Sequence, residues 1–178
     1  MSGETDFVTE LGRAFLAHRL RRLAETFLEG YGRWLPTMGI TAPARSLSTL
    51  LLLESDGPLG VTALAARLRL SHPLLIKLTG SLDAQGFTRT APDPSDARRR
   101  LIALTDAGRA EAERVRRAVD ILDRAYGELM DEIGIDLMEG CARAEQACLA
   151  MSFDERLQRA VAEIHSKEEA ACAPSASP

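Results

Sequence analysis

Two short predicted helices with a very short connection, followed at once by two strand candidates, constrain the fold of this chain more than any other feature. The stretch VTALAARLRL (61–70) has apolar residues on one helical face, and Thr62 is its expected N-cap. The stretch SHPLLIKLTGSLDAQG (71–86) begins with Ser71 as N-cap and carries Pro73 in its first turn. Two such helices predict a helix-turn-helix.

The segment after the second helix predicts a β-hairpin. The short strands FTRTA (87–91) and RLIAL (100–104) are joined by PDPSDARR, so residues 93–99 form the expected tip. Thr105 then caps a new helix. A hairpin attached directly to a helix-turn-helix is a winged helix-turn-helix. The fold class is therefore mainly α with a small β-hairpin wing.

Long amphipathic helices are expected on both sides of the winged region. Residues 7–35 are expected to form one helix, and Ser152 with Glu155 forms a capping box for the last one. The apolar faces of these two helices carry Leu16, Leu20, Leu23, Phe27 and Trp34 in the first, and Phe153, Leu157, Val161 and Ile164 in the last.

Charge is distributed unevenly along the chain. Residues 45–109 hold nine Lys/Arg and six Asp/Glu, whereas residues 110–178 hold eight basic and fifteen acidic side chains. The overall net charge of −4 does not exclude nucleic-acid binding, because only the docking face must be positive. The middle of the chain is therefore a basic island and a candidate nucleic-acid site.

Several classes of protein are disfavoured. There is no apolar run of about 18 residues, so no membrane partner is expected. The first residues, MSGETDFVTELG, lack the basic start and apolar stretch of a signal peptide. The three cysteines form no C-x-x-C, which favours reduced thiols and a cytoplasmic location. Cys141 and Cys148 are seven residues apart on one helical face and are expected to be buried structural thiols.

Enzyme motifs are also missing from the sequence. It contains no G-x-G-x-x-G, P-loop, H-E-x-x-H or G-x-S-x-G pattern, and His18, His72 and His165 are scattered. We therefore expect no catalytic residues, no cofactor and no metal site, and the chain is not expected to be an enzyme.

The chain resembles the MarR-type (multiple antibiotic resistance regulator) family over about residues 10–165. The residues that carry the resemblance are Leu64-Ala65-Ala66-Arg67-Leu68, Leu82 with Gly86, the wing Asp93-Pro94-x-Asp96-x-Arg98, and Leu104-Thr105-x-x-Gly108. The combination of this wing with L-T-x-x-G is more specific than the helix-turn-helix alone.

The resemblance implies a bacterial homodimer that binds double-stranded DNA at a pseudo-palindromic operator, with a repressor as the first expectation. It divides the chain into four parts: an N-terminal dimerisation helix and linker (1–43), the winged helix-turn-helix (44–109), C-terminal dimerisation helices (110–170) and a disordered tail (171–178).

The resemblance also implies DNA-binding residues. Arg98 matches an arginine that enters the minor groove, and Asp96 matches an acid that orients it, while Arg99 and Arg100 alternate on the strand. Leu74 and Ile76 either contact thymine methyl groups or pack within the domain. The expected set is Ser71, His72, Pro73, Leu74, Ile76, Lys77, Ser81, Asp96, Arg98 and Arg99.

This region departs from the family pattern at several positions. Lys77 is the only permanently charged side chain on the exposed side of the second helix, and Ser95 stands where the family often has a basic residue. Arg69 occupies a turn position that is often glycine, so we expect it to adopt a left-handed backbone. These departures support an alternative function, a winged-helix module that acts through protein contacts without sequence-specific DNA binding.

In the family, small phenolic or anionic effectors bind between the dimer helices and the wing domain. The candidate lining residues here are Tyr31, Trp34 and Met38, with Arg45 as partner for an anion, and His18 and Arg19 are further candidates. The alternative for Trp34 and Met38 is ordinary core packing.

Overall fold

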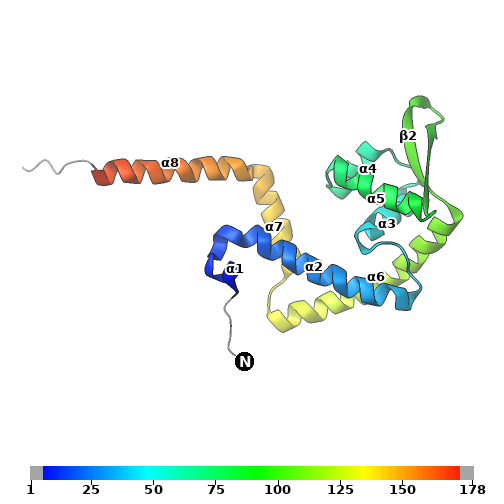
Figure 1. Ribbon diagram of the computed structural model, residues 1–178, viewed down its shortest axis with the longest axis horizontal. Helices are drawn as coiled ribbons and strands as arrows, with labels where there is room; N and C mark the ends of the chain where they lie inside the picture. Colours follow the sequence, from blue (N-terminus) through cyan, green and yellow to red (C-terminus); the bar gives the residue numbers. More distant parts are fainter. Residues whose placement is uncertain (1–5, 173–178) are drawn as a thin grey trace, which may run out of the picture. The chain divides into compact units, whose positions relative to one another are not determined.

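The structure, a computed structural model, describes residues 6–172, apart from the side chains of residues 97 and 168–172. The chain forms two compact units, residues up to Asp123 and residues from Arg124. In chain order the elements are α1 (Phe7–Glu10), η1 (Gly12–Phe15), α2 (Leu16–Trp34), η2 (Leu35–Met38), η3 (Ala44–Ser46), α3 (Leu47–Asp56), α4 (Val61–Leu68), α5 (His72–Ala84), β1 (Thr88–Asp93), β2 (Asp96–Leu104), α6 (Asp106–Ile133), α7 (Leu137–Ala150) and α8 (Phe153–Cys172). The predicted winged helix-turn-helix is confirmed (Figure 1).

The expectation of one helix over residues 7–35 is wrong. Gly12 has a φ of +64°, which separates α1 from α2. The side chain of Asp6 caps α1 by accepting the backbone N–H of Val8, and it pairs with Arg22 at 2.6 Å. The hydrogen bond from Arg22 lowers the pKa of Asp6 to about 2. This ion pair ties α1 to the side of α2.

The core of the first unit lies between the three helices of the winged region. Leu50 of α3, Leu64 of α4 and Leu75 and Leu82 of α5 are all fully buried, because the apolar residues of each helix recur on one face. Leu78 is also buried, which confirms the predicted stripe of Leu75, Leu78 and Leu82.

The ends of the two short helices were only partly predicted. Gly86 has a φ of +76° directly after α5, as expected for a helix stop. Ser71 is the N-cap residue of α5, although its side chain makes no capping hydrogen bond. Thr62 was wrongly assigned as N-cap of the preceding helix, because α4 begins at Val61 and Gly60 holds the N-cap position.

The wing is a two-stranded antiparallel hairpin that projects beyond the helices of its unit (Figure 1). Both strands are longer than the sequence indicated, so that only Pro94 and Ser95 form the turn. The strands pair from Thr88 with Leu104 to Pro92 with Arg100, and the register shifts after Pro92. At the base of the wing, Leu59 and Ile102 form two backbone hydrogen bonds with each other, at 3.1 and 2.9 Å.

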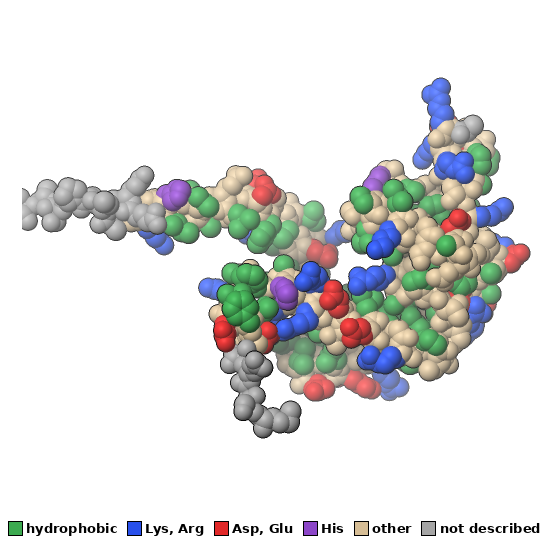
Figure 2. Space-filling view, in the orientation of Figure 1, with side chains coloured by type: hydrophobic (Ala, Val, Ile, Leu, Met, Phe, Trp, Pro, Cys, Tyr) green, Lys and Arg blue, Asp and Glu red, His purple; other side chains and the backbone are tan. Residues whose placement is uncertain are grey.

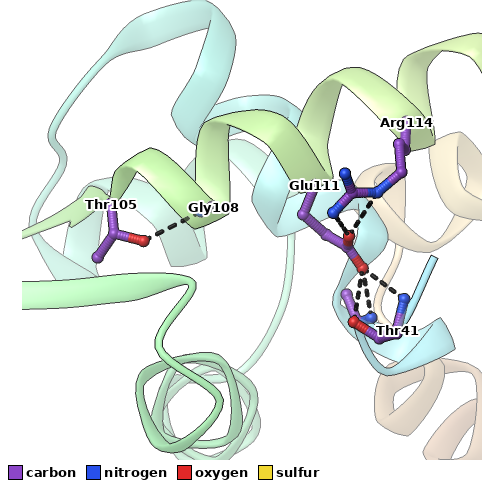
Figure 3. Close-up of polar contacts among 6 residues, drawn as sticks. Thr41, Thr105, Gly108, Glu111 and Arg114 are labelled. Carbon is purple, nitrogen blue, oxygen red and sulfur yellow. Dashed lines mark hydrogen bonds and ion pairs between the residues drawn. The ribbon is translucent and has the colours of Figure 1, made fainter. Parts of the chain in front are cut away.

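Thr105 connects the start of α6 to the residues just before β1 (Figure 3). Thr105 Oγ1 accepts the backbone N–H of Gly108 at 3.0 Å, which confirms the predicted cap. The same hydroxyl donates to the carbonyl of Gly86 at 2.6 Å. Gly108 lies so close to this junction that a Cβ built on it would be 1.9 Å from the carbonyl oxygen of Phe87.

One turn further along α6, Glu111 is a fully buried carboxylate (Figure 3). Its Oε1 accepts the backbone N–H groups of Thr41 and Ala42 at 2.5 and 2.6 Å, and its Oε2 pairs with Arg114. Burial raises the pKa of Glu111, but the hydrogen bonds from Ala42, Arg114 and Thr41 outweigh it and leave the pKa below its ordinary value. The carboxylate therefore stays ionised and anchors the linker before α3.

The second unit contains the end of α6 together with α7 and α8. Ser152 and Glu155 form the predicted capping box, with Ser152 N–H donating to Glu155 Oε2 at 2.8 Å. Cys141 and Cys148 are both exposed on α7, so their expected burial is wrong for the described chain. Phe153, Leu157, Val161 and Ile164 of α8 are each more than half exposed: 64%, 54%, 51% and 55%.

None of the described helices is long and apolar enough to cross a membrane. The predicted tail lies, from residue 173 onwards, outside the described residues.

Candidate nucleic-acid interface

Helix α5 presents most of the predicted DNA-binding residues on its solvent side. Leu75, Leu78, Thr79 and Leu82 occupy its buried side, because they recur every three or four residues. The exposed residues are Ser71, His72, Pro73, Leu74, Ile76 and Lys77, whereas Ser81 is half-buried.

The two apolar residues on this surface differ in exposure. The residue exposure is 39% for Leu74 and 59% for Ile76. Leu74 is therefore covered by the domain over more than half of its surface. Ile76 is mostly exposed and is available for contact with another molecule.

The turn between α4 and α5 has a left-handed residue, as the sequence indicated. Arg69 has φ 51° and ψ 40°, and its backbone N–H closes the end of α4 on the carbonyl of Ala66. This conformation favours glycine, because the Cβ of other residues crowds the backbone there. A positively charged residue thus stands at the junction of the two helices despite some backbone strain.

The wing places Asp96, Arg98 and Arg99 in solvent. Asp96 does not hold the guanidinium of Arg98 as the resemblance implied. Its Oδ1 accepts the backbone N–H of Arg98 at 3.0 Å, so it shapes the main chain after the turn. Among the side chains that the structure describes, none is a hydrogen-bond or ion-pair partner of the Arg98 guanidinium.

Asp93 closes the wing turn and was not recognised as a site residue from the sequence. Its Oδ1 accepts the hydroxyl of Ser95 at 2.6 Å and the backbone N–H of Ser95 at 2.8 Å. These bonds, led by the hydroxyl, lower the pKa of Asp93. The signal was present in Asp-Pro-Ser, because an aspartate two residues before a turn amide is typical of an Asx-turn.

Further cations surround this part of the wing. Arg99 alternates with Arg98 and Arg100 along β2, so it lies on the other face, where the register places Arg89 of β1. Arg89 is exposed and was also missed, although the strand pattern T-R-T-A contains it. Arg100 reaches across the hairpin to the carbonyl of Thr90 at 3.5 Å. Figure 2 shows Lys and Arg side chains on the projecting hairpin.

The four predicted effector residues differ in their surroundings. Tyr31, Trp34 and Met38 are half-buried and pack against the core of the first unit. Arg45 instead lines a hollow of about 320 Å³ whose other lining residues are Leu28, Pro43, Ala44, Lys77, Leu78 and Ser81. Two cations and a hydroxyl thus border an otherwise apolar hollow beside α5.

Across the described part of the chain, no group of three or more His, Cys, Asp or Glu side chains is placed to hold a metal ion.

Curated relatives match part of the chain. An HTH-type transcriptional regulator of Mycobacterium tuberculosis is 35% identical over 72 residues, which is 40% of this chain and 50% of that protein. An uncharacterised HTH-type transcriptional regulator of Mycobacterium bovis matches with the same figures. The chain thus spans about half the length of the curated relatives it matches. No protein-family model matches the chain.

Solved structures share the fold over most of their length. A mutant MarR from E. coli complexed with operator DNA has a TM-score of 0.58 at 18% identity, covering 83% of this chain and 99% of that one. A probable transcriptional regulator from Pseudomonas aeruginosa has a TM-score of 0.53 at 24% identity, covering 75% and 96%. At these identities the likeness establishes the winged-helix fold of this group.

Proposed function

We propose that this chain, which has the fold of MarR-type winged-helix regulators, is a non-enzymatic transcription regulator that binds double-stranded DNA as a homodimer. It recognises a pseudo-palindromic operator and acts as a repressor. The observation that carries the proposal is the unpaired guanidinium of Arg98. Arginines of α6 such as Arg114, Arg116 and Arg117 pair with glutamates, whereas Arg98 projects from the wing without a partner among the described residues.

Arg98 supplies the direct test of DNA binding. In Arg98→Ala the dimer loses two minor-groove contacts, each worth about 1–3 kcal/mol. Operator affinity should therefore fall at least about tenfold, with a shallower dependence on salt because fewer counterions are released. Fluorescence anisotropy on an operator selected by the wild-type protein, at two salt concentrations, measures both effects.

Arg117→Ala is the matched control, because it removes an exposed arginine whose partner is Glu113 on the same helix. It should bind the operator almost as the wild type does. Wild-type affinity in Arg98→Ala at both salts would contradict the wing contact. A selection that returns only background sequences would instead favour a protein-interaction module without sequence-specific DNA binding.

The exposed apolar helix faces support the homodimer. Leu157, Val161 and Ile164 follow one another along α8 at helical spacing, and Leu16 and Leu20 do so on α2. Apolar faces of this kind are typical of surfaces that associate. Light scattering at micromolar concentration should report twice the chain mass of 19.3 kDa.

Leu157→Glu should shift this mass towards that of the monomer, because it places a charge within the apolar face of α8. Gln158→Glu adds the same charge about a quarter-turn away on this exposed helix and should leave the mass unchanged. A monomeric wild-type protein would refute the homodimer.

The hollow beside α5 supports control by a small anionic effector. An aromatic carboxylate there would lie near Arg45 and Lys77 and would compete with DNA for the lysine. Adding a phenolic carboxylate such as salicylate should weaken operator binding by the wild type, and Arg45→Ala should lose this response. The control Arg33→Ala removes an exposed arginine of α2 outside the hollow. An unchanged response in Arg45→Ala would exclude this site.

A further inference from the structure

The N-terminal half of α5 offers apolar rather than polar contacts at the surface proposed to face DNA. Ile76 is 59% exposed, and it is the most exposed apolar side chain among the large hydrophobic residues of this helix. From residue 71 to residue 82 the sequence SHPLLIKLTGSL contains one permanent charge, Lys77, and no carboxylate. Beside the polar Ser71, His72 and Lys77, the exposed Leu74 and Ile76 can therefore offer apolar contacts to bases.

The surroundings of Ile76 leave room for a close approach. On the helix surface its neighbours one turn away are His72 and Pro73 on one side and Gly80 and the buried Thr79 on the other. A Cβ built on Gly80 would meet nothing within 4 Å, so the helix backbone is open at that point. A flat object such as the edge of a base pair can therefore reach Ile76 without displacing a long side chain.

The charge around this apolar position favours DNA as its occupant. Lys77 is adjacent, and Arg89, Arg98 and Arg99 are exposed on the wing of the same unit. A duplex presents negative phosphates along the rims of a major groove, and the one apolar group that its bases display in that groove is the C5-methyl of thymine. An apolar residue beside Lys77, on the same unit as the exposed Arg98 of the wing, is complementary to that arrangement.

We infer that Ile76 contacts the C5-methyl group of a thymine in each half-site and thereby selects thymine at that position. The inference rests on the proposed function, since it requires α5 to enter the major groove. Ile76 would then be a specificity-determining residue of that interface.

Deoxyuridine provides a test that changes nothing except the methyl group. Thymines of an operator selected by the wild type from a random duplex pool are replaced in turn by deoxyuridine, at equivalent positions of both half-sites. At one position, removing the methyl group from a single half-site should lower the affinity about fourfold, as expected for burial of one methyl-sized group. Removing it from both half-sites should lower the affinity about fifteenfold.

Two variants test whether Ile76 causes the difference in affinity between thymine and deoxyuridine. Ile76→Ala should bind the thymine operator more weakly and should show no difference between thymine and deoxyuridine at that position. Lys77→Ala is the matched control, because loss of a phosphate contact should weaken binding to both duplexes equally and preserve their ratio. Both residues are exposed, and circular dichroism verifies that each variant is folded.

Equal affinity of the wild type for every deoxyuridine duplex would overturn the inference while leaving the regulator intact. A thymine preference that persists in Ile76→Ala would also overturn it. If no operator is selected at all, the proposed function fails, and this inference fails with it.

Discussion

Glu111→Ala should lower the free energy of unfolding by about 2–4 kcal/mol, because the buried amide of Ala42 loses its acceptor and Arg114 loses its charge partner. The carboxylate accepts the N–H groups of Thr41 and Ala42 and neutralises Arg114, and its side chain is fully buried. Alanine leaves two amides and a guanidinium without this partner. Urea unfolding at fixed protein concentration measures the loss as a lower midpoint.

Two further variants separate the contribution of the Glu111 charge from that of its hydrogen bonds. Glu111→Gln keeps an oxygen for the amides of Thr41 and Ala42 but removes the charge, so it should destabilise less than alanine. Glu113→Gln removes an exposed carboxylate that pairs with Arg117, and it should change stability by less than about 1 kcal/mol. A loss in Glu111→Ala no larger than that in Glu113→Gln would show that the buried anchor contributes little.

The stability of the chain at acid pH should also depend on Glu111. Because the pKa of Glu111 is lower in the folded chain, its contribution is complete above the unfolded pKa and is lost as the pH falls through the folded pKa. Glu111→Gln should therefore lie closest to the wild type at low pH.

Gly108→Ala should destabilise the chain by at least about 3 kcal/mol, or prevent folding, because overpacking against backbone is not relieved by a rotamer change. The added methyl would lie 1.9 Å from the carbonyl oxygen of Phe87 and 2.8 Å from its carbonyl carbon. That carbonyl already accepts the backbone N–H of Thr105 at 3.0 Å, which limits its movement. Thermal unfolding followed by circular dichroism measures the change.

Gly32→Ala is the control for Gly108→Ala. Gly32 is exposed in α2, and a Cβ there would meet nothing within 4 Å. Alanine should stabilise this helix by up to about 1 kcal/mol through its higher helix propensity. The two substitutions should therefore differ in sign, and stabilisation by both would contradict the close packing at Phe87.

The fold of the winged region could be predicted because its signals are local. The stripe of Leu75, Leu78 and Leu82, the glycine stop at Gly86 and the cap at Thr105 each depend on residues within a few positions of one another. The break at Gly12 could not be predicted in this way. Glycine is tolerated inside helices, and the turn there is accompanied by an ion pair between residues sixteen positions apart, Asp6 and Arg22.

The site was predicted less completely than the fold. The sequence placed Lys77 and Arg98 on the right elements, but the solvent exposure of Ile76 follows from how α5 packs on its neighbours. The role of Glu111 was missed, although a signal existed. Glu111, Val115 and Ala118 recur at spacings of four and three, so the acid lies on the buried stripe of α6.

The two hydrogen bonds between Leu59 and Ile102 also bear on how the wing is positioned. They join the base of the wing to the loop between α3 and α4, and at the same root Thr105 donates a hydrogen bond to Gly86 and caps α6. The hairpin is thus braced at its root and has no free hinge there. In the proposed DNA complex, α5 and the wing would therefore contact the duplex at a spacing that is set by the root of the hairpin.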